Sequence, residues 1–273
     1  MAEERDPQAT RFTRAGASGR LEDAWEAEAE RWASWARAPG HDSYWLFHRD
    51  VFRALLPPPP ALTLDVGCGE GRLPRDLHSW GYQVVGIDAS ETLIGYARDA
   101  DPGGSYQVAD GAALPFEDAS FDLVTAFMTL HDIEDTPNAV REAARVLRGD
   151  GAFCMAVVHP LASAGRFESR EPGARFVVDG SYLETRRYAD TVERDGLAMT
   201  FHSRHRPMHA YVDMLTGSGL LVDRLVEVPD LSDPPGSRWR RMPLFLQIRA
   251  VKPRFPGGAV DDPARNSDNG GRD

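Results

Sequence analysis

The sequence predicts an α/β protein in which a mostly parallel, seven-stranded sheet carries helices on both of its faces. Apolar segments of strand length alternate along the chain with segments of helical periodicity, which is the order of a parallel sheet with crossover helices. One apolar segment runs into a glycine-rich turn and then into a helix, the start of a βαβ unit. The length of 273 residues allows one large domain with insertions.

Before the sheet, the sequence predicts a polar segment and two helices. Residues 1–20 are rich in small and charged residues, and we expect them to form a mobile N-terminus. Residues 21–60 contain an apolar stripe at helical spacing, a Pro-Gly break, a second helical stretch and a run of prolines. We expect these helices to form a lid over the sheet, with Tyr44 and His48 of the second helix facing a substrate.

The stretch LDVGCGEG, residues 64–71, is the most informative part of the chain. Its glycines let the backbone turn sharply and approach a ligand without a Cβ in the way. A dinucleotide site expects the pattern G-x-G-x-x-G, but Arg72 stands at the sixth position here. Asp65 precedes the first glycine, where a carboxylate would repel a pyrophosphate. This acid suits a ligand that presents an ammonium group and no phosphate, and S-adenosylmethionine has that profile.

Two further acids are predicted at the ends of the next two strands. Residues 82–87 form an apolar strand that ends at Asp88, where a carboxylate can bind both hydroxyls of a ribose. Residues 105–109 form a third strand, and Asp110 and Gly111 follow it, placed to accept a hydrogen bond from an adenine amino group. An adenosyl ligand would therefore lie across three strand ends.

The rest of the sheet is predicted from shorter signals. A fourth buried strand spans residues 120–127 and a fifth spans 151–158, and a helix that starts at Thr136 joins them. Residues 207–251 hold one helix and two more strands, which form the C-terminal part of the sheet. Residues 252–273 are rich in Gly, Pro, Asp and Asn, and we expect a disordered tail.

An insertion, residues 161–206, follows the fifth strand and contains two hairpin signals. Asp179-Gly180 and Asp195-Gly196 are turn dipeptides, and each lies between two strand-like runs. Parallel sheets of this kind bind ligands at the carboxyl ends of their strands. Because the N-terminal helices and this insertion are the segments free to cover that edge, we expect the insertion to act as a substrate lid.

Four linked segments, LDVGCGEGR, VVGIDAS, VADGAALPFEDASFDLV and EAARVLRGDGAF, resemble the class I S-adenosylmethionine-dependent methyltransferases. The most similar group is the small-molecule one that includes the ubiquinone and menaquinone biosynthesis methyltransferases. The resemblance covers residues 61–160, the cofactor-binding core, and extends more loosely to about residue 250. It implies a Rossmann-like fold, S-adenosyl-L-methionine as the cofactor and S-adenosyl-L-homocysteine as its product. It also implies that Asp65 helps to hold the methionine amino group through water and backbone, that Asp88 binds the ribose and that Asp110 orients the adenine.

The full set of expected cofactor-binding residues lies on the glycine turn and at the strand ends. It comprises Asp65, Gly67, Cys68, Gly69, Asp88, Ala89, Asp110, Gly111 and Phe127.

Histidines supply the candidates for a proton acceptor, since methyl transfer needs a base only when the nucleophile must lose a proton. His131 follows the fourth strand and His159 ends the fifth, so we expect both at the ligand-binding edge as catalytic residues. His202 and His205 lie in the insertion and are expected to contact the substrate. The histidine spacing does not indicate a metal site.

Composition excludes several partners. The formal net charge of −11 and the pI of about 5.2 disfavour a nucleic-acid partner. Residues 128–132 also lack the Asn/Asp-Pro-Pro-aromatic run of methyltransferases that act on base amines. Two cysteines form no disulfide framework, no apolar run reaches ~20 residues and no signal peptide opens the chain. We expect a cytoplasmic protein without membrane contact, either a monomer or a homodimer.

These observations predict O-, N- or C-methylation of a small-molecule acceptor, with secondary metabolism as one setting. Two alternatives stay open at this point. The chain could catalyse a non-methylating step such as a cyclisation, or it could bind S-adenosylmethionine without turnover. A dinucleotide oxidoreductase is disfavoured by Asp65 and Arg72.

Overall fold

The computed structural model describes residues 11–15 and 19–254. Residues 1–10, 16–18 and 255–273, most of the two segments expected to be mobile or disordered, lie outside this description. Residues 11–15 belong to the N-terminal segment that we expected to be mobile. They form strand β1 (Arg11–Ala15), which pairs antiparallel with strand β9 (Arg186–Arg194).

The central sheet has seven strands in the order β11-β12-β6-β5-β2-β3-β4, which confirms the predicted mostly parallel seven-stranded sheet. All its strands run in one direction except β12, which is antiparallel to both neighbours. The strands are β2 (Leu62–Val66), β3 (Gln83–Asp88), β4 (Ser105–Val108), β5 (Phe121–Phe127), β6 (Leu147–Val158), β11 (Leu221–Val228) and β12 (Phe245–Val251).

Helices cover both faces of this sheet, as predicted. Helices α5 (Thr136–Val146) and α7 (Met208–Gly217) pack on one face. The other face carries a π-helical turn η1 (Tyr44–His48), α2 (Arg49–Arg53) and α3 (Arg72–Ser79), with α4 (Glu91–Ala100) beside β4. Central strands are buried on both faces and therefore read as continuous apolar runs in the sequence.

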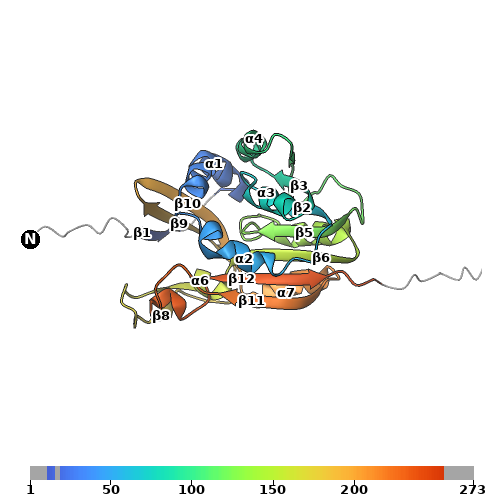
Figure 1. Ribbon diagram of the computed structural model, residues 1–273. Helices are drawn as coiled ribbons and strands as arrows, with labels where there is room; N and C mark the ends of the chain where they lie inside the picture. The colour runs from blue at the N-terminus through green and yellow to red at the C-terminus, as the bar shows by residue number, and fades with distance from the viewer. Residues whose placement is uncertain (1–10, 16–18, 255–273) are drawn as a thin grey trace, which may run out of the picture.

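Two groups of elements flank the carboxyl edge of the sheet (Figure 1). On one side lie α1 (Leu21–Arg37) and the hairpin of β9 and β10 (Leu197–His205), which pack against each other. On the other side lie α6 (Pro160–Ala164), the paired strands β7 (Gly165–Phe167) and β8 (Phe176–Val178), and the 229–244 connection with its 3₁₀ turn η2 (Arg238–Arg240).

One of the two predicted hairpins is confirmed and the other is wrong. Asp195-Gly196 forms the turn between β9 and β10. The run before Asp179-Gly180 does pair as strand β8, but its partner is β7, which precedes it, and not residues 182–183. The Asp179 amide donates to the carbonyl of Ala164 at 3.0 Å, so this dipeptide joins β8 back to α6.

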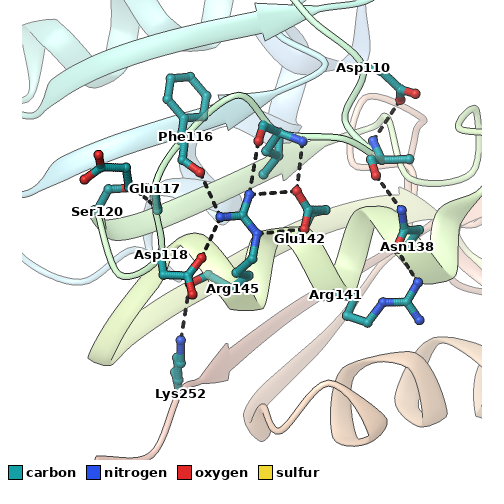
Figure 2. A network of polar contacts seen from close by, with 12 residues as sticks. Asp110, Phe116, Glu117, Asp118, Ser120, Asn138, Arg141, Glu142, Arg145 and Lys252 are labelled. Carbon is teal, nitrogen blue, oxygen red and sulfur yellow. Dashed lines mark hydrogen bonds and ion pairs between the residues drawn. The ribbon is translucent and has the colours of Figure 1, made fainter.

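A polar network fixes the loop that follows β4 and carries Asp110 (Figure 2). Arg145 of α5 donates to the carbonyls of Leu114 and Phe116 at 3.0 and 2.8 Å. Asn138 on the same helix donates to the carbonyl of Ala112 at 2.5 Å. Because α5 is itself packed on the sheet, the loop holds Asp110 in a set position relative to the strand ends.

Within the described ranges, no helix has both the length and the apolar character needed to cross a bilayer.

Candidate active site

A cavity of about 1190 Å³ opens at the carboxyl ends of β2, β3 and β5. It is bounded by the glycine turn, by α1 with the β9–β10 hairpin, and by β7 with the 229–244 connection. All nine expected cofactor-binding residues line it: Asp65, Gly67, Cys68, Gly69, Asp88, Ala89, Asp110, Gly111 and Phe127.

The glycine turn after β2 requires glycine for two separate reasons. Gly67, Gly69 and Gly71 have φ values of +71°, +57° and +85°, in the left-handed region that other residues rarely adopt. Gly67 also has no room for a side chain, because a Cβ there would lie 2.0 Å from the Thr129 hydroxyl oxygen. The turn therefore presents bare backbone to the cavity, with the amides of Gly67 and Cys68 donating to the carbonyl of Ile87 at 2.8 Å.

We expect Gly67→Ala to lower the free energy of unfolding by more than the ~1–2 kcal/mol of its left-handed backbone alone. Gly180→Ala is the matched control, because Gly180 has a φ of +72° and no heavy atom within 4 Å of a Cβ. Adding Thr129→Gly should recover part of the loss by removing the clashing side chain. Chemical denaturation measures all three, and equal losses in Gly67→Ala and Gly180→Ala would contradict the steric argument.

Asp88, the last residue of β3, joins the glycine turn to the start of α4. One carboxylate oxygen accepts from the Gly69 amide at 2.8 Å and the other from the Ser90 amide at 2.9 Å. Burial raises the pKa of Asp88, while these backbone donors oppose that change. Each oxygen retains acceptor capacity, so the carboxylate can still bind two adjacent hydroxyls.

Asp65 lies beneath the turn, almost completely buried. Its carboxylate accepts from the Thr125 hydroxyl of β5 at 2.6 Å. Burial raises the pKa of Asp65 to about 7, against the opposing effects of Thr125 and Arg72. A buried acid that is only partly compensated is suited to receive a cationic group.

Asp110 and Gly111 follow β4 and line the cavity beside the ends of β2 and β3. One Asp110 carboxylate oxygen accepts from the Ala112 amide at 2.8 Å. A Cβ on Gly111 would come within 2.9 Å of Val66 on β2, so glycine allows the loop to lie close against the strand.

Sequence reasoning used Arg72 only to reject a dinucleotide site and missed its structural role. The residue opens α3, is buried, and forms an ion pair with Asp42 in the segment before η1. Its guanidinium carbon also lies 4.7 Å from the ring centroid of Trp32 and 5.2 Å from that of Tyr44. Arg72 therefore ties the N-terminal helices to the cofactor-binding turn. The only signal in the sequence was its position at the N-terminus of α3.

Of the two expected catalytic histidines, the structure places His131 at the cavity. His131 lies in the loop after β5 and is buried, and its Nδ1 has no hydrogen-bond partner among the described residues. Its Nε2 lies 3.6 Å from a carboxylate oxygen of Asp132, which accepts from the Ser203 hydroxyl of β10 at 2.7 Å. Burial, together with the nearby Arg206, lowers the pKa of His131 to about 3, so its imidazole is neutral.

His159 does not share this position, although β5 and β6 are neighbours as expected. Its Nδ1 accepts from the Leu161 amide at 3.0 Å and caps α6, and its Nε2 lies 2.9 Å from Glu227 on β11. It is not among the residues that line the cavity. Both ring nitrogens serve the local structure, so the geometry does not support His159 as a base.

The four expected substrate residues are likewise absent from the cavity lining. Tyr44 is buried and donates to Asp76 at 2.6 Å, and the ring of His48 stacks 4.3 Å from that of Phe245. His205 is buried and held by Ser163 and the carbonyl of Tyr182. His202 accepts from Trp25 through its backbone carbonyl.

Aromatic residues of α1 and β10 take the place that the histidines were expected to fill. Trp25, Trp32 and Trp35 of α1 all line the cavity together with Phe201 of β10. The rings of Trp25, Trp32 and Trp35 lie 5.9–6.4 Å from that of Phe201 in edge-to-face arrangements. This cluster forms an apolar wall of the cavity.

The core of the chain matches a known family. Residues 64–155 match the family described as Methyltransferase domain. A probable S-adenosylmethionine-dependent methyltransferase of Mycobacterium tuberculosis is 34% identical over 156 residues, which are 52% of this chain and 57% of that protein. The 27-O-demethylrifamycin SV methyltransferase of Amycolatopsis mediterranei is 37% identical over 34% of this chain and 36% of that protein. The demethylmenaquinone methyltransferase of Roseiflexus castenholzii is 34% identical over 41% of this chain and 49% of that protein. The chain thus spans roughly half, or less, of the length of these relatives.

Solved structures share the fold over a larger part of the chain. An S-adenosylmethionine-dependent methyltransferase from Mesorhizobium loti superposes with a TM-score of 0.64 and 26% identity, over 77% of this chain and 98% of that one. A [4+2]-cyclase superposes with a TM-score of 0.60 and 17% identity, over 90% of this chain and all of that one. At that identity the second likeness shows the fold alone.

Proposed function

The chain belongs to the class I S-adenosylmethionine-dependent methyltransferase family, and from this premise we propose that it transfers a methyl group to a small-molecule acceptor. One observation carries the proposal. The acidic strand ends and the neutral His131 line the same cavity, so a methyl donor and a proton acceptor can meet there.

S-adenosyl-L-methionine is the cofactor, and the residues at the strand ends fit it. We assign the ribose hydroxyls to Asp88, the adenine amino group to Asp110 and the methionine ammonium to Asp65. Gly67 and Gly69 allow the close approach of the backbone that this requires. When bound, the cofactor supplies a methyl group that is already electrophilic, so positioning and exclusion of water account for most of the catalysis.

We assign the exclusion of water to two lids. Trp25, Trp32 and Phe201 present apolar surface to the cavity from α1 and β10. On the opposite side, β7 and the 229–244 connection close the part of the cavity away from the cofactor residues. We assign to His131 the acceptance of the proton of an oxygen or nitrogen nucleophile.

We expect the affinity for S-adenosylmethionine to increase as the pH rises from 6 to 8. The raised pKa of about 7 means that Asp65 is largely protonated at pH 6 and largely ionised at pH 8 in the free protein. The ammonium group binds the ionised form, so binding releases a proton near pH 7. Calorimetry in buffers of different ionisation enthalpy measures this release. Asp65→Asn should abolish the pH dependence, and a constant affinity across this range in the unaltered protein would refute the assignment.

A small acceptor is supported by the cavity at the strand ends and by the relatives whose names specify rifamycin and menaquinone precursors. We propose a product of secondary metabolism as the first acceptor class to examine, because of the likeness to the rifamycin enzyme. Nucleic acid is disfavoured by the net charge of −11.

Transfer of labelled methyl to a small-molecule extract tests the proposed function. The protein is incubated with methyl-labelled S-adenosylmethionine and an extract from which macromolecules have been removed. We expect label in a new small molecule and an equal amount of S-adenosyl-L-homocysteine. Conversion of an extract component without label, or with no homocysteine product, would indicate the non-methylating alternative.

A further inference from the structure

The end of the cavity farthest from the cofactor residues contains an arginine whose charge is not neutralised by the protein. Arg238 lies in the connection between β11 and β12 and lines the cavity. Its Nε is buried without a hydrogen-bond partner, and its guanidinium forms no hydrogen bond or ion pair with any residue in the described ranges. The guanidinium carbon lies 5.7 Å from the centroid of the Phe167 ring.

Apart from the exposed Arg170, the other charged groups at this end of the cavity are already engaged. Arg166 pairs with Asp179 at 2.8 Å. Asp233 accepts from the Ser237 hydroxyl at 2.8 Å, and Asp230 accepts from the amide and hydroxyl of Ser232 at 2.9 and 2.5 Å. These acids close turns within the 229–244 connection and do not pair with Arg238. The protein thus retains an arginine at the cavity wall that lacks a counter-charge, in a chain with a net charge of −11.

The position of Arg238 separates it from the donor end. The β12 strand is four places from β3 in the sheet, about 19 Å at ~4.8 Å per strand. Asp65, Asp88 and Asp110 make the donor end acidic, whereas Arg238 places a positive charge without an ion-pair partner at the other end. The Trp239 and Phe167 rings lie edge to face with centroids 4.9 Å apart and offer an apolar surface beside the guanidinium.

We propose that Arg238 binds an oxyanion of the methyl acceptor, a carboxylate or a phosphoryl group, attached to an apolar or aromatic body that packs against Phe167 and Trp239. This rests on the proposed function and specifies its substrate class. A guanidinium is suited to the role because its donors are fixed in a plane and can bind two oxygens of one anion. The ring of Phe167 holds the guanidinium in place without consuming its hydrogen-bond donors.

Binding of small probes tests the site independently of turnover. The protein is saturated with S-adenosyl-L-homocysteine and titrated with phenylacetate, phenyl phosphate and the neutral phenylacetamide, with detection by NMR. We expect at least one anion to bind about tenfold or more tightly than the amide, the effect of a charge-assisted hydrogen bond. Whether the carboxylate or the phosphate binds better distinguishes the two oxyanions. Absence of any preference, including absence of binding by all three probes, would overturn the proposal.

Two variants test whether Arg238 is the residue that causes the preference for the anionic probes. Arg238→Gln should remove the preference for the anion while leaving the affinity for S-adenosylmethionine unchanged. Arg170→Gln is the matched control, because Arg170 also lines the cavity but is exposed to solvent, and it should keep the preference. An anion preference that survives in Arg238→Gln, or a tenfold loss of S-adenosylmethionine affinity in that variant, would show that Arg238 does not bind the oxyanion of the acceptor.

Fractionation of the extract connects the site to the reaction. When the extract is separated on an anion exchanger before methylation, the acceptor should be in the retained fraction, and Arg238→Gln should raise its KM about tenfold or more. Methylation confined to the unretained fraction would overturn this inference while leaving the proposed function intact. Failure to methylate any fraction would count against the proposed function, and the probe titration would still decide the anion site.

Discussion

Replacing Asp88 with alanine is expected to weaken the binding of S-adenosylmethionine at least tenfold while the protein remains folded. The carboxylate would form two charge-assisted hydrogen bonds with the ribose, each worth roughly 1.5–3 kcal/mol. It also fixes the backbone of Gly69 and Ser90, so its removal loosens the turn that faces the ligand. Calorimetry with S-adenosyl-L-homocysteine measures the loss, and circular dichroism reports the fold.

Asp99→Ala provides the control for the Asp88 variant. Asp99 lies on the exposed side of α4, so the substitution removes the same charge one helix away from the site. The control should bind the ligand normally. Equal affinities in the unaltered protein and Asp88→Ala would place the ribose contact elsewhere in the cavity.

Replacing His131 with alanine is expected to lower kcat by about 10²–10⁴ for an oxygen or nitrogen acceptor, with the affinity for S-adenosylmethionine unchanged. His131 is the histidine that combines a position at the cavity with an unpartnered ring nitrogen. Its pKa of about 3 sets the pH dependence. The imidazole is the neutral, proton-accepting form at pH values well above 3, so kcat at saturating substrates should not fall through loss of this base between pH 8 and 5.

His159→Ala is the matched histidine control. Because both nitrogens of His159 are engaged by Leu161 and Glu227, its loss should reduce stability and leave kcat near normal. Equal kcat values for His131→Ala and the unaltered protein would mean that the acceptor loses its proton without help from His131. Positioning alone would then account for catalysis, as it would for a carbon nucleophile that needs no base.

The cofactor end could be predicted because its residues follow directly from local sequence. Asp88 and Asp110 each come at or just after the end of a strand, and parallel strands bring such ends to a common edge. The glycine pattern also determines the conformation of the turn between Val66 and Arg72, because that signal is local to the sequence. No long-range packing had to be known to place these groups together.

The acceptor end depends on packing between distant segments, which the sequence pattern does not specify. Tyr44 and His48 lie in a π-helical turn, so the 3.6-residue period does not describe which way they face. An apolar stripe with Trp25 and Trp32 looks the same in sequence whether it packs on a core or lines a cavity. Arg238 lies in an irregular connection with no periodicity, and only the fold brings it beside Phe167.

A crystal structure with S-adenosyl-L-homocysteine bound tests the central claim most directly, since that claim is that one cavity holds both donor and acceptor. We predict the ribose on Asp88, the amino group beside Asp65, and the sulfur directed into the open part of the cavity on the side of His131 and the aromatic wall. The part of the cavity that receives the methyl acceptor should extend from the sulfur toward Arg238. A ligand bound outside the strand ends, or a sulfur separated from that part of the cavity by α1 and β7, would contradict the account.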